Sequence, residues 1–576
     1  MTDLKQKIGE VNIEQTYVAA CSVVENSQDR CKTGEGISMP AEEQPNMETS
    51  YITGIKLWSM LASLVLVFFL LLLDMSIVAT AIPKITSQFH SLHDVGWYGS
   101  AYLLSNCVLQ PLTGKIYVRF STKRTFIAFF GLFEFGSLVC GLSQSSKMLI
   151  TGRAIAGMGS SGLMNGGIQM CYLAIPAHRR PMIMGVLMSC SQLGVLCGPL
   201  LGGLLTEYSS WRWCFYINLP IGALATIAMV FVNVPKALTK EMATNVEDQK
   251  SRIKFLLYDL DIAGFALFAS FSVMVVLALQ WGGVDYAWSS ATIIGLFVGG
   301  GCSLLIFAVH QYRLGDSAMF PWSVVRQRVV WSSMVTMFFF FGSQIIGNYF
   351  LPIYFQTIRN ASPAMSGVYT LPSIFSMMAA SVGSGALLSR WGYYLPWVMA
   401  SAILAAVGNG LLSSLGLHTS TVRWVWYQII LGFGRGCGMQ MTIVAVQTNL
   451  PPTTVPIGQA MIIFEQYFGG ALFLAIAQAL FNGKLDMGLT EYAPHVDAQS
   501  VIHAGASRVR DIVSSDDLSG VLLAYSKAIN SNFYLAAACS AVTVLTGLGM
   551  GWRKVERNKS AKHARATTGK SEATDK

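Results

Sequence analysis

Five ionisable residues stand inside long apolar runs of this 576-residue chain and are the first candidates for chemistry. They are Asp74, Glu134, Arg153, Arg435 and Glu465. A charge in the middle of a bilayer costs about 3 kcal/mol or more, so such residues usually serve ion or proton pathways. The chain has no GxxxxGK[ST] phosphate loop and no HExxH set. The pattern therefore favours proton exchange over ATP hydrolysis or metal-dependent catalysis.

Asp74 and Arg153 are expected at similar depths. Asp74 lies nine residues before Pro83, where the first apolar run ends, and Arg153 lies five residues after Met148, where the fourth begins. At about 1.5 Å per helical residue, both depths are about 7 to 13 Å. We hypothesise that Asp74 binds a proton and that Arg153 tunes its affinity, because burial favours the neutral carboxyl group whereas a nearby guanidinium favours the carboxylate. The alternative is a static ion pair between two helices.

Small residues recur at every fourth position of the fifth apolar run. They are Gly194, Gly198 and Gly202, accompanied by Pro199 and Gly203. This spacing removes the side chains from one helix face, so another helix can approach closely. The proline removes a backbone hydrogen bond and bends the helix. Such an interface suits a helix that slides, although ordinary small-residue packing is the alternative.

A second group of polar residues is expected to line a cavity in the second half of the chain. It consists of Glu465, Gln344, Asn348, Gln440 and Gln447. Polar side chains in hydrocarbon are costly unless they face protein or water. Facing the interior is therefore expected in any case, and substrate binding is the functional hypothesis.

The elements that must carry these residues follow from composition. Hydrophobic residues make up 53% of the chain and charged residues 12%, whereas soluble domains carry about 25% charged residues. One membrane span needs about 20 apolar residues. The composition therefore excludes a soluble enzyme, a disulfide-rich secreted domain and a protein with a single anchor, and it predicts an all-α polytopic membrane protein.

Alternation of apolar runs and polar breaks predicts fourteen spans. They lie near 57–82, 97–117, 125–142, 148–174, 183–205, 213–233, 261–281, 290–312, 329–351, 366–388, 396–415, 424–447, 458–482 and 528–552. The predicted domains are a disordered cytoplasmic tail (1–56), a six-helix bundle (57–234), a cytoplasmic linker with two extra transmembrane helices (235–328), a second six-helix bundle (329–552) with a long external loop (483–527), and a basic cytoplasmic tail (553–576).

Charge distribution predicts that both termini are cytoplasmic. With that orientation, 28 of the 39 Lys and Arg residues fall on cytoplasmic segments, as the positive-inside rule requires. The two halves also echo each other. Gly114 and Gly385 each precede a cation by five residues, Arg119 and Arg390, in the loop after the second span of each bundle. Duplicated bundles are typical of transporters that rock about a central site.

Four motifs resemble the major facilitator superfamily, and within it the 14-spanner drug:proton antiporters, most closely the fungal toxin and multidrug efflux pumps. Leu73–Pro83 resembles the LDxTIVxxALP signature and Trp211–Gly222 the WRWxFxINxPxG signature. Gly194–Gly203 is similar to the antiporter motif GxxxGPxxGG, and Arg153–Gly159 to an RxxxGxG motif linked to proton transfer. The resemblance covers roughly 57–552 and implies two six-helix bundles plus two extra central helices.

One motif departs from the family pattern. In the loop after the second span, Val118 stands where the family's aspartate would be, and Ser121 stands where its second glycine would be, while Arg119 remains. The acidic half of that loop's salt-bridge network is therefore expected to be missing.

The resemblance implies a proton-coupled exporter of small, mostly hydrophobic compounds such as drugs, toxins or secondary metabolites. A siderophore, ferric-chelate or amino-acid transporter is an alternative, and a membrane solute sensor that moves nothing is an alternative of another class. No enzymatic activity, cofactor, metal or nucleic acid is expected. A monomer in the plasma membrane is expected, with the vacuolar membrane as the alternative. Asn360 lies in an external Asn-Ala-Ser sequon and is a possible glycosylation site.

Overall fold

The computed structural model describes residues 51–90, 94–231, 259–283, 286–496, 501, 509–514 and 516–555. Most of the predicted N-terminal tail, the charged part of the linker before Asp259, part of the loop 483–527 and the basic tail after Val555 lie outside the described residues. The described part of the chain is helical apart from two isolated bridges.

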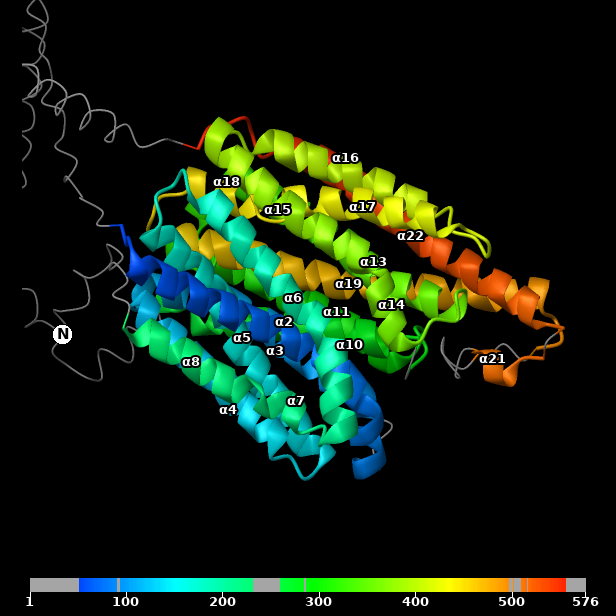
Figure 1. The fold of residues 1–576 in the computed structure, drawn as a ribbon. Coiled ribbons are helices and arrows are strands. Elements are labelled where there is room, and N and C mark those ends of the chain that lie inside the picture. Colours follow the sequence, from blue (N-terminus) through cyan, green and yellow to red (C-terminus); the bar gives the residue numbers. More distant parts are fainter. Residues whose placement is uncertain are drawn as a thin grey trace, which may run out of the picture. The chain divides into compact units, whose positions relative to one another are not determined.

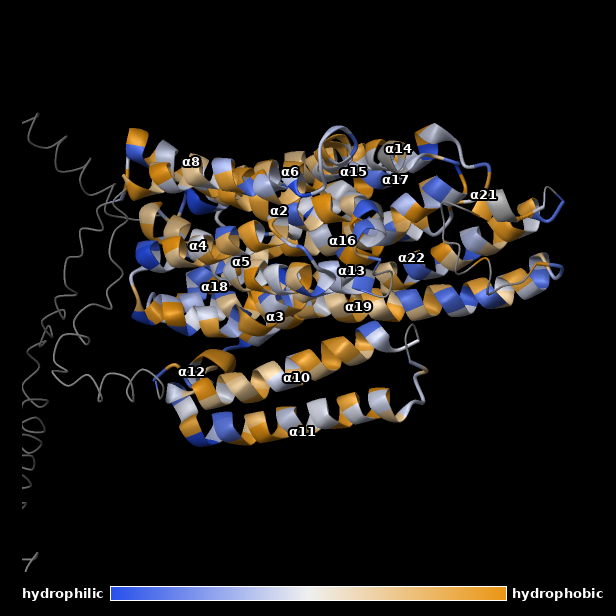
Figure 2. Ribbon diagram, turned by 90° about the horizontal axis from the view of Figure 1, so that it is seen from below, coloured by the Kyte–Doolittle hydropathy of each residue, from blue (hydrophilic) through white to orange (hydrophobic). Residues whose placement is uncertain are grey.

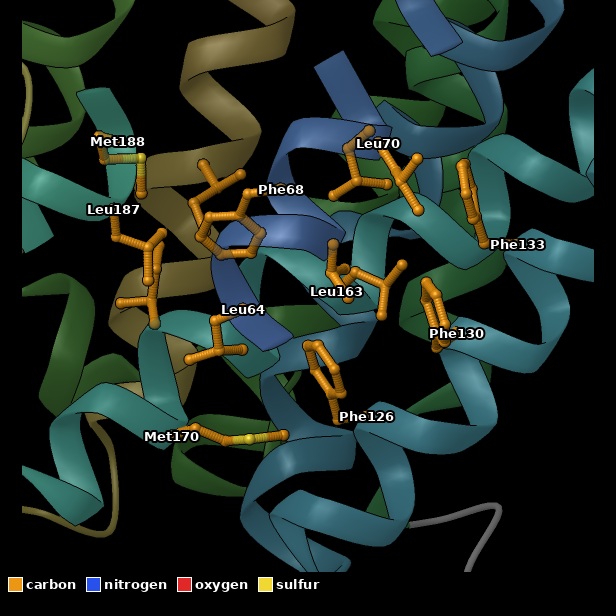
Figure 3. Close-up of a cluster of buried hydrophobic side chains, with 14 of the residues drawn as sticks. Leu64, Phe68, Leu70, Phe126, Phe130, Phe133, Leu163, Met170, Leu187 and Met188 are labelled. Carbon is orange, nitrogen blue, oxygen red and sulfur yellow. The ribbon is translucent and has the colours of Figure 1, made fainter. Parts of the chain in front are cut away.

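The first half of the chain forms six long helical segments. They are α2 (Ile55–Phe89), α3 (Val95–Arg119), α4 (Thr122–Gly141), α5 (Ser146–Ala174), α6 (Arg180–Tyr208), and α7 (Trp213–Tyr216) continued by α8 (Asn218–Val230). Here α2 packs against α6 and α8, and α5 packs against α3 and α4. Their shared core contains Leu64, Phe68, Phe126, Leu163 and Met188 (Figure 3).

The second half forms a further six long segments with short connecting helices. They are α13 (Arg328–Thr357), α15 (Leu371–Trp391), α16 (Leu395–Leu412), α17 (Thr421–Gly438) continued by α18 (Met441–Asn449), α19 (Val455–Tyr492) and α22 (Leu518–Leu548), with α12 (Trp322–Val325), α14 (Pro363–Tyr369) and α21 (Val509–Ile512) between them. Here α13 packs against α19 and α22, and α17 packs against α15 and α16 (Figure 1).

Two helices stand between the halves in sequence and form a pair of their own. They are α10 (Ile262–Trp281) and α11 (Ala291–Leu314). They pack against each other, and α10 also contacts α3 and α19 (Figure 2). The contact is aromatic, since the ring of Phe268 lies 4.8 Å from that of Phe464 on α19. The inserted pair therefore covers the line along which α3 and α19 meet.

Twelve helices of the described part are long and apolar enough to cross a membrane. The other two predicted spans correspond to α3 and α5, which have 25 and 29 residues but a more polar composition. These lengths and compositions agree with a multi-pass membrane fold, and the count of fourteen spans stays a prediction.

The two halves meet along two seams, α3 with α19 and α6 with α15. Helix α2 begins and helix α22 ends at the same end of the structure (Figure 1). We call this end the basic end. Close approaches lie there on both seams. A Cβ atom on Gly114 would lie 2.9 Å from Cα of Ile457, and a Cβ atom on Gly185 would lie 2.5 Å from the carbonyl oxygen of Ser381. Only glycine fits at these positions, so the two halves are in close contact at the basic end on both seams.

Candidate functional site

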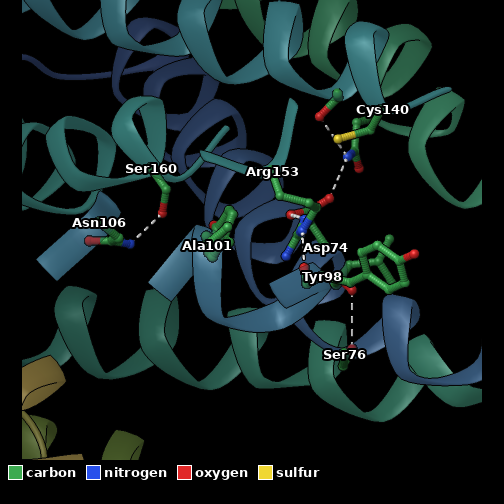
Figure 4. A network of polar contacts seen from close by, with 12 residues as sticks. Asp74, Ser76, Tyr98, Ala101, Asn106, Cys140, Arg153 and Ser160 are labelled. Carbon is green, nitrogen blue, oxygen red and sulfur yellow. Dashed lines mark hydrogen bonds and ion pairs between the residues drawn. The ribbon is translucent and has the colours of Figure 1, made fainter. Parts of the chain in front are cut away.

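The structure joins Asp74 and Arg153 in an ion pair inside the first half of the chain. Arg153 Nη1 on α5 lies 2.5 Å from Asp74 Oδ2 on α2, and Arg153 Nε donates a hydrogen bond of 2.8 Å to the carbonyl oxygen of Tyr98 on α3 (Figure 4). Both charged residues are buried, with 0% and 1% of their surface exposed. The pair therefore links three helices, and because both groups are buried, breaking it has a large electrostatic effect.

Asn218, the first residue of α8, completes the shell around Asp74. Its Nδ2 donates to Asp74 Oδ1 at 3.3 Å and to Ser137 Oγ of α4 at 3.1 Å. Both oxygens of the Asp74 side chain therefore accept hydrogen bonds. Sequence reasoning did not single out Asn218, although the residue belongs to the quoted segment Trp211–Gly222.

Hydrogen bonds hold the loop that precedes α7 and α8, and they position Asn218 at the start of α8. Trp211 Nε1 donates to Gln88 Oε1 near the end of α2 at 2.8 Å, and Arg212 Nη2 donates to the carbonyl oxygen of Ser143 after α4 at 2.9 Å. Tyr102 lies on the remaining side of the ion pair, with Arg153 Cζ 4.5 Å from its ring centre. Such a contact holds a guanidinium in place without neutralising it.

Three glycines of the segment Gly194–Gly203 face the turn of α2 that carries Asp74. A Cβ atom on Gly194 would lie 2.8 Å from the backbone nitrogen of Leu73, and one on Gly198 would lie 3.0 Å from that of Ile77. Gly202 meets the same stretch, while a Cβ atom on Gly203 would have nothing within 4 Å. Ser76 Oγ also donates to the carbonyl oxygen of Gly194 at 3.1 Å. Helix α6 therefore contacts the backbone beside the ion pair, and Gly203 takes no part in that contact.

The second half contains a related arrangement without a carboxylate. Arg435 on α17 is 4% exposed. Its Nη1 donates to Asn348 Oδ1 on α13 at 3.0 Å, and its Nη2 donates to the carbonyl oxygen of Ser343 at 3.3 Å. Asn348 thus occupies the place that Asp74 has in the first half, and sequence reasoning did not pair it with Arg435.

The other residues expected to line a cavity are distributed over several helices. Gln440 donates to the carbonyl oxygen of Ser381 on α15 at 3.1 Å, so it lies at the seam with α6. Gln344 and Gln447 are buried, and Glu465 on α19 is partly buried. Among the described residues, no hydrogen bond joins any two of the five. Their shared role stays a prediction.

The loop after α3 obtains an acidic partner from a distant part of the sequence. Arg119 forms an ion pair with Asp259, just before α10, and Lys115 Nζ donates to the carbonyl oxygens of Asp259 and Ser317 at 3.1 and 2.6 Å. The expectation that the acidic half of this network is missing was therefore wrong. It considered only neighbours in sequence, whereas Asp259 follows Arg119 by 140 positions.

Asn360 is exposed and has a positive φ of 52°, between α13 and α14 at the end opposite the basic end. Asparagine tolerates this conformation better than most residues do. The position is accessible, and modification stays a prediction.

Comparison with known proteins gives one family. The model of the Major Facilitator Superfamily matches residues 64–474. The chain is 49% identical over 531 residues to "Efflux pump mlcE" of Penicillium citrinum, covering 90% of this chain and 96% of that one. It is 50% identical over 506 residues to "Efflux pump mokI" of Monascus pilosus, covering 88% and 93%.

Solved structures agree on the fold. The proton:xylose symporter XylE superposes with a TM-score of 0.54 at 14% identity, covering 87% of this chain and 97% of that one. The human organic anion transporter MFSD10 gives 0.52 at 13% identity, covering 84% and 100%. At such identities the likeness concerns the fold alone.

Proposed function

This chain belongs to the major facilitator superfamily and is a multi-pass membrane transporter rather than an enzyme, and from this premise we propose that it exports small, mostly hydrophobic organic compounds in exchange for protons. Two relatives that share about half of its residues carry the name efflux pump, which supports the outward direction. Drugs, toxins and secondary metabolites are the proposed substrate class. The proposed location is the plasma membrane, with both termini cytoplasmic, and the basic end then faces the cytoplasm.

The observation that carries the proposed coupling is the buried contact between Asp74 and Arg153. A proton taken up by Asp74 removes its charge and leaves Arg153 with neutral partners only, the carbonyl oxygen of Tyr98 and the ring of Tyr102. The force that holds α2 to α5 then weakens. In this account, loss of the proton restores the ion pair, so the two states of Asp74 favour different arrangements of α2 and α5.

The proposed change reaches the rest of the bundle through α6. Its glycine face lies against the backbone of α2 on both sides of Asp74, so a shift of α2 is transmitted without displacing bulky side chains. Pro199 interrupts the hydrogen bonding of α6 and gives it a site of bending. We propose that 57–234 and 329–552 move as two bundles, linked by 235–328.

We propose that the exported compound binds toward the second half, where Asn348 on α13 contacts Arg435 and further polar residues lie on α13, α18 and α19 and at the start of α18. The proposed contacts are Gln344, Asn348, Gln440, Gln447 and Glu465. Glycosylation of Asn360 is proposed separately and would be visible as a gel shift that an endoglycosidase reverses.

A vesicle experiment tests the function. Purified full-length protein is reconstituted into liposomes, a pH gradient is imposed, and movement of candidate compounds is followed with and without a protonophore. Accumulation on the acidic side that collapses with the protonophore supports proton-driven export. Movement that is the same after the gradient is abolished contradicts it, and no movement of any compound favours a sensor that transports nothing.

A further inference from the structure

A pocket at the basic end of the α6–α15 seam concentrates positive charge. Its lining includes Pro181 at the start of α6, Arg390 and Gly392 at the end of α15, and Lys554 after α22. His178 also lines it, and among the described residues no aspartate or glutamate does. Cations brought together without an acidic residue repel one another, so such a pocket favours an anionic ligand.

The chain after α22 is fixed so that Lys554 joins this pocket. The backbone nitrogen of Val555 donates to the carbonyl oxygen of Gly392 at 2.8 Å, and Lys554 forms an antiparallel bridge with Tyr393. Val555 is buried in a cluster with Leu388 and Tyr394. Gly392 ends α15 with a φ of 84°, a conformation that favours glycine. The juxtaposition of Arg390 and Lys554 is therefore built into the fold.

Comparison with the other half shows what this pocket lacks. Arg119 and Arg390 occupy equivalent helix ends, those of α3 and α15, and Arg119 has Asp259 as its carboxylate partner. Within the described part of the chain, no ion pair involves Arg390. The ammonium group of Lys554 lies 5.6 Å from the ring of Tyr393, a contact that leaves its charge uncompensated. Both Arg390 and Lys554 are exposed, so their charges are accessible to an anionic ligand.

The surroundings of the pocket indicate where that anion comes from. Trp391, which lines the pocket, is 58% exposed, and Trp552, two residues before Lys554, is 66% exposed. Exposed tryptophans next to cations are typical of the boundary between hydrocarbon and lipid headgroups. Basic pockets between transmembrane helices at such a boundary suit phosphorylated headgroups.

We propose that this pocket binds the phosphate of an anionic phospholipid, with Arg390 and Lys554 as its principal contacts. The pocket spans both halves of the transporter, because Pro181 belongs to α6 whereas Arg390 belongs to α15. A bound headgroup therefore bridges the two halves beside the close approach of Gly385 to the backbone of Pro181 and stabilises their close contact at the basic end. This inference concerns lipid binding and does not depend on proton coupling.

Direct binding tests the proposal without requiring transport. Full-length protein is placed in phosphatidylcholine nanodiscs, and binding of fluorescent phosphatidylinositol 4-phosphate is titrated. The double variant Arg390→Gln with Lys554→Gln is expected to bind at least about tenfold more weakly. The matched control Arg313→Gln with Arg326→Gln removes two exposed cations from the same end, away from the pocket, and is expected to bind like the parent protein.

Further measurements test whether each variant is folded and whether the bound phosphate belongs to a membrane lipid or to a soluble compound. Lys554→Arg keeps the charge and is expected to retain binding, and thermal unfolding of every variant shows whether it is folded. Soluble inositol phosphate is titrated in the same way. Much tighter binding of the lipid supports a headgroup held at the membrane boundary. Equal binding of soluble phosphate, or equal lipid binding by the parent and the Arg390/Lys554 variant, overturns the proposal.

Discussion

Replacement of Asp74 by asparagine should separate transport from proton coupling. The amide keeps an oxygen that can accept hydrogen bonds from Arg153 and Asn218, but it cannot carry a proton in the range where a carboxyl group titrates. With one proton per molecule, a pH difference of about two units supports an accumulation of about a hundredfold, since each unit is worth about 1.4 kcal/mol. In Asp74→Asn this ratio should fall to about one.

The assay compares net accumulation with exchange. Proteoliposomes with an imposed pH gradient report accumulation, a pH-sensitive dye reports substrate-induced proton movement, and exchange of labelled for unlabelled substrate reports a working binding site. Asp74→Asn is expected to lose the first two and retain the third. Glu207→Gln is the matched control, because it neutralises an exposed carboxylate near the end of α6 in the same bundle. It should keep all three activities.

A double variant distinguishes coupling from a purely structural ion pair. Arg153 is 1% exposed, and leaving such a charge without its partner costs about 3 to 5 kcal/mol, less where an amide remains as acceptor. Asp74→Asn should therefore lower the unfolding temperature, and adding Arg153→Gln should recover part of the loss. Stability that returns without proton-driven accumulation supports coupling. If accumulation returns with stability, or if Asp74→Asn alone accumulates substrate like the parent, the reasoning is refuted.

Two further predictions concern the contacts that surround this site. Gly198→Leu should abolish efflux without preventing membrane insertion, because a side chain at this position collides with Ser76. Gly203→Leu should retain most efflux, because a side chain at this position meets open space. Whole-cell efflux, normalised to the amount of protein at the cell surface, checks both predictions. Asp259→Arg alone should reduce activity by up to about fivefold, since a partly exposed ion pair contributes up to about 1 kcal/mol. Exchanging the charges of Arg119 and Asp259 should restore that activity, and restoration that fails despite normal folding contradicts a role for the pair.

The sequence was most informative where a helix alone determines a position. The depths of Asp74 and Arg153 follow from counting residues along two apolar runs, and the four-residue spacing of Gly194, Gly198 and Gly202 predicts one smooth face. Gly203 could not be distinguished from these by its residue type. One step along a helix turns the side chain by about 100°, and the structure shows that this places position 203 off the interface.

The sequence was least informative where a contact depends on how loops dock. Asn218 reaches Asp74 because Trp211 and Arg212 fasten the preceding turn to α2 and to the end of α4, which no periodicity reveals. Asp259 provides Arg119 with a carboxylate partner, although the two residues are far apart in the sequence. The relatively polar composition of α5 has a related cause, since it carries Arg153 and many small residues that pack inside the bundle.

The two halves of the molecule differ at equivalent places both in chemical group and in burial, since Asp74 is buried whereas Asn348 is exposed, and this difference bears on how the proposed work is divided. Arg153 contacts a carboxylate, whereas Arg435 contacts the amide of Asn348. An amide cannot exchange a proton, so the second half has no titratable counterpart of Asp74 at that point. Arg435 also has no carboxylate within salt-bridge distance among the described residues. The first bundle contains the titratable pair of Asp74 and Arg153, whereas the second contains the cation of Arg435 without a carboxylate. Protonation would therefore alter the first bundle, while the polar groups of the second bundle remain available to bind the compound.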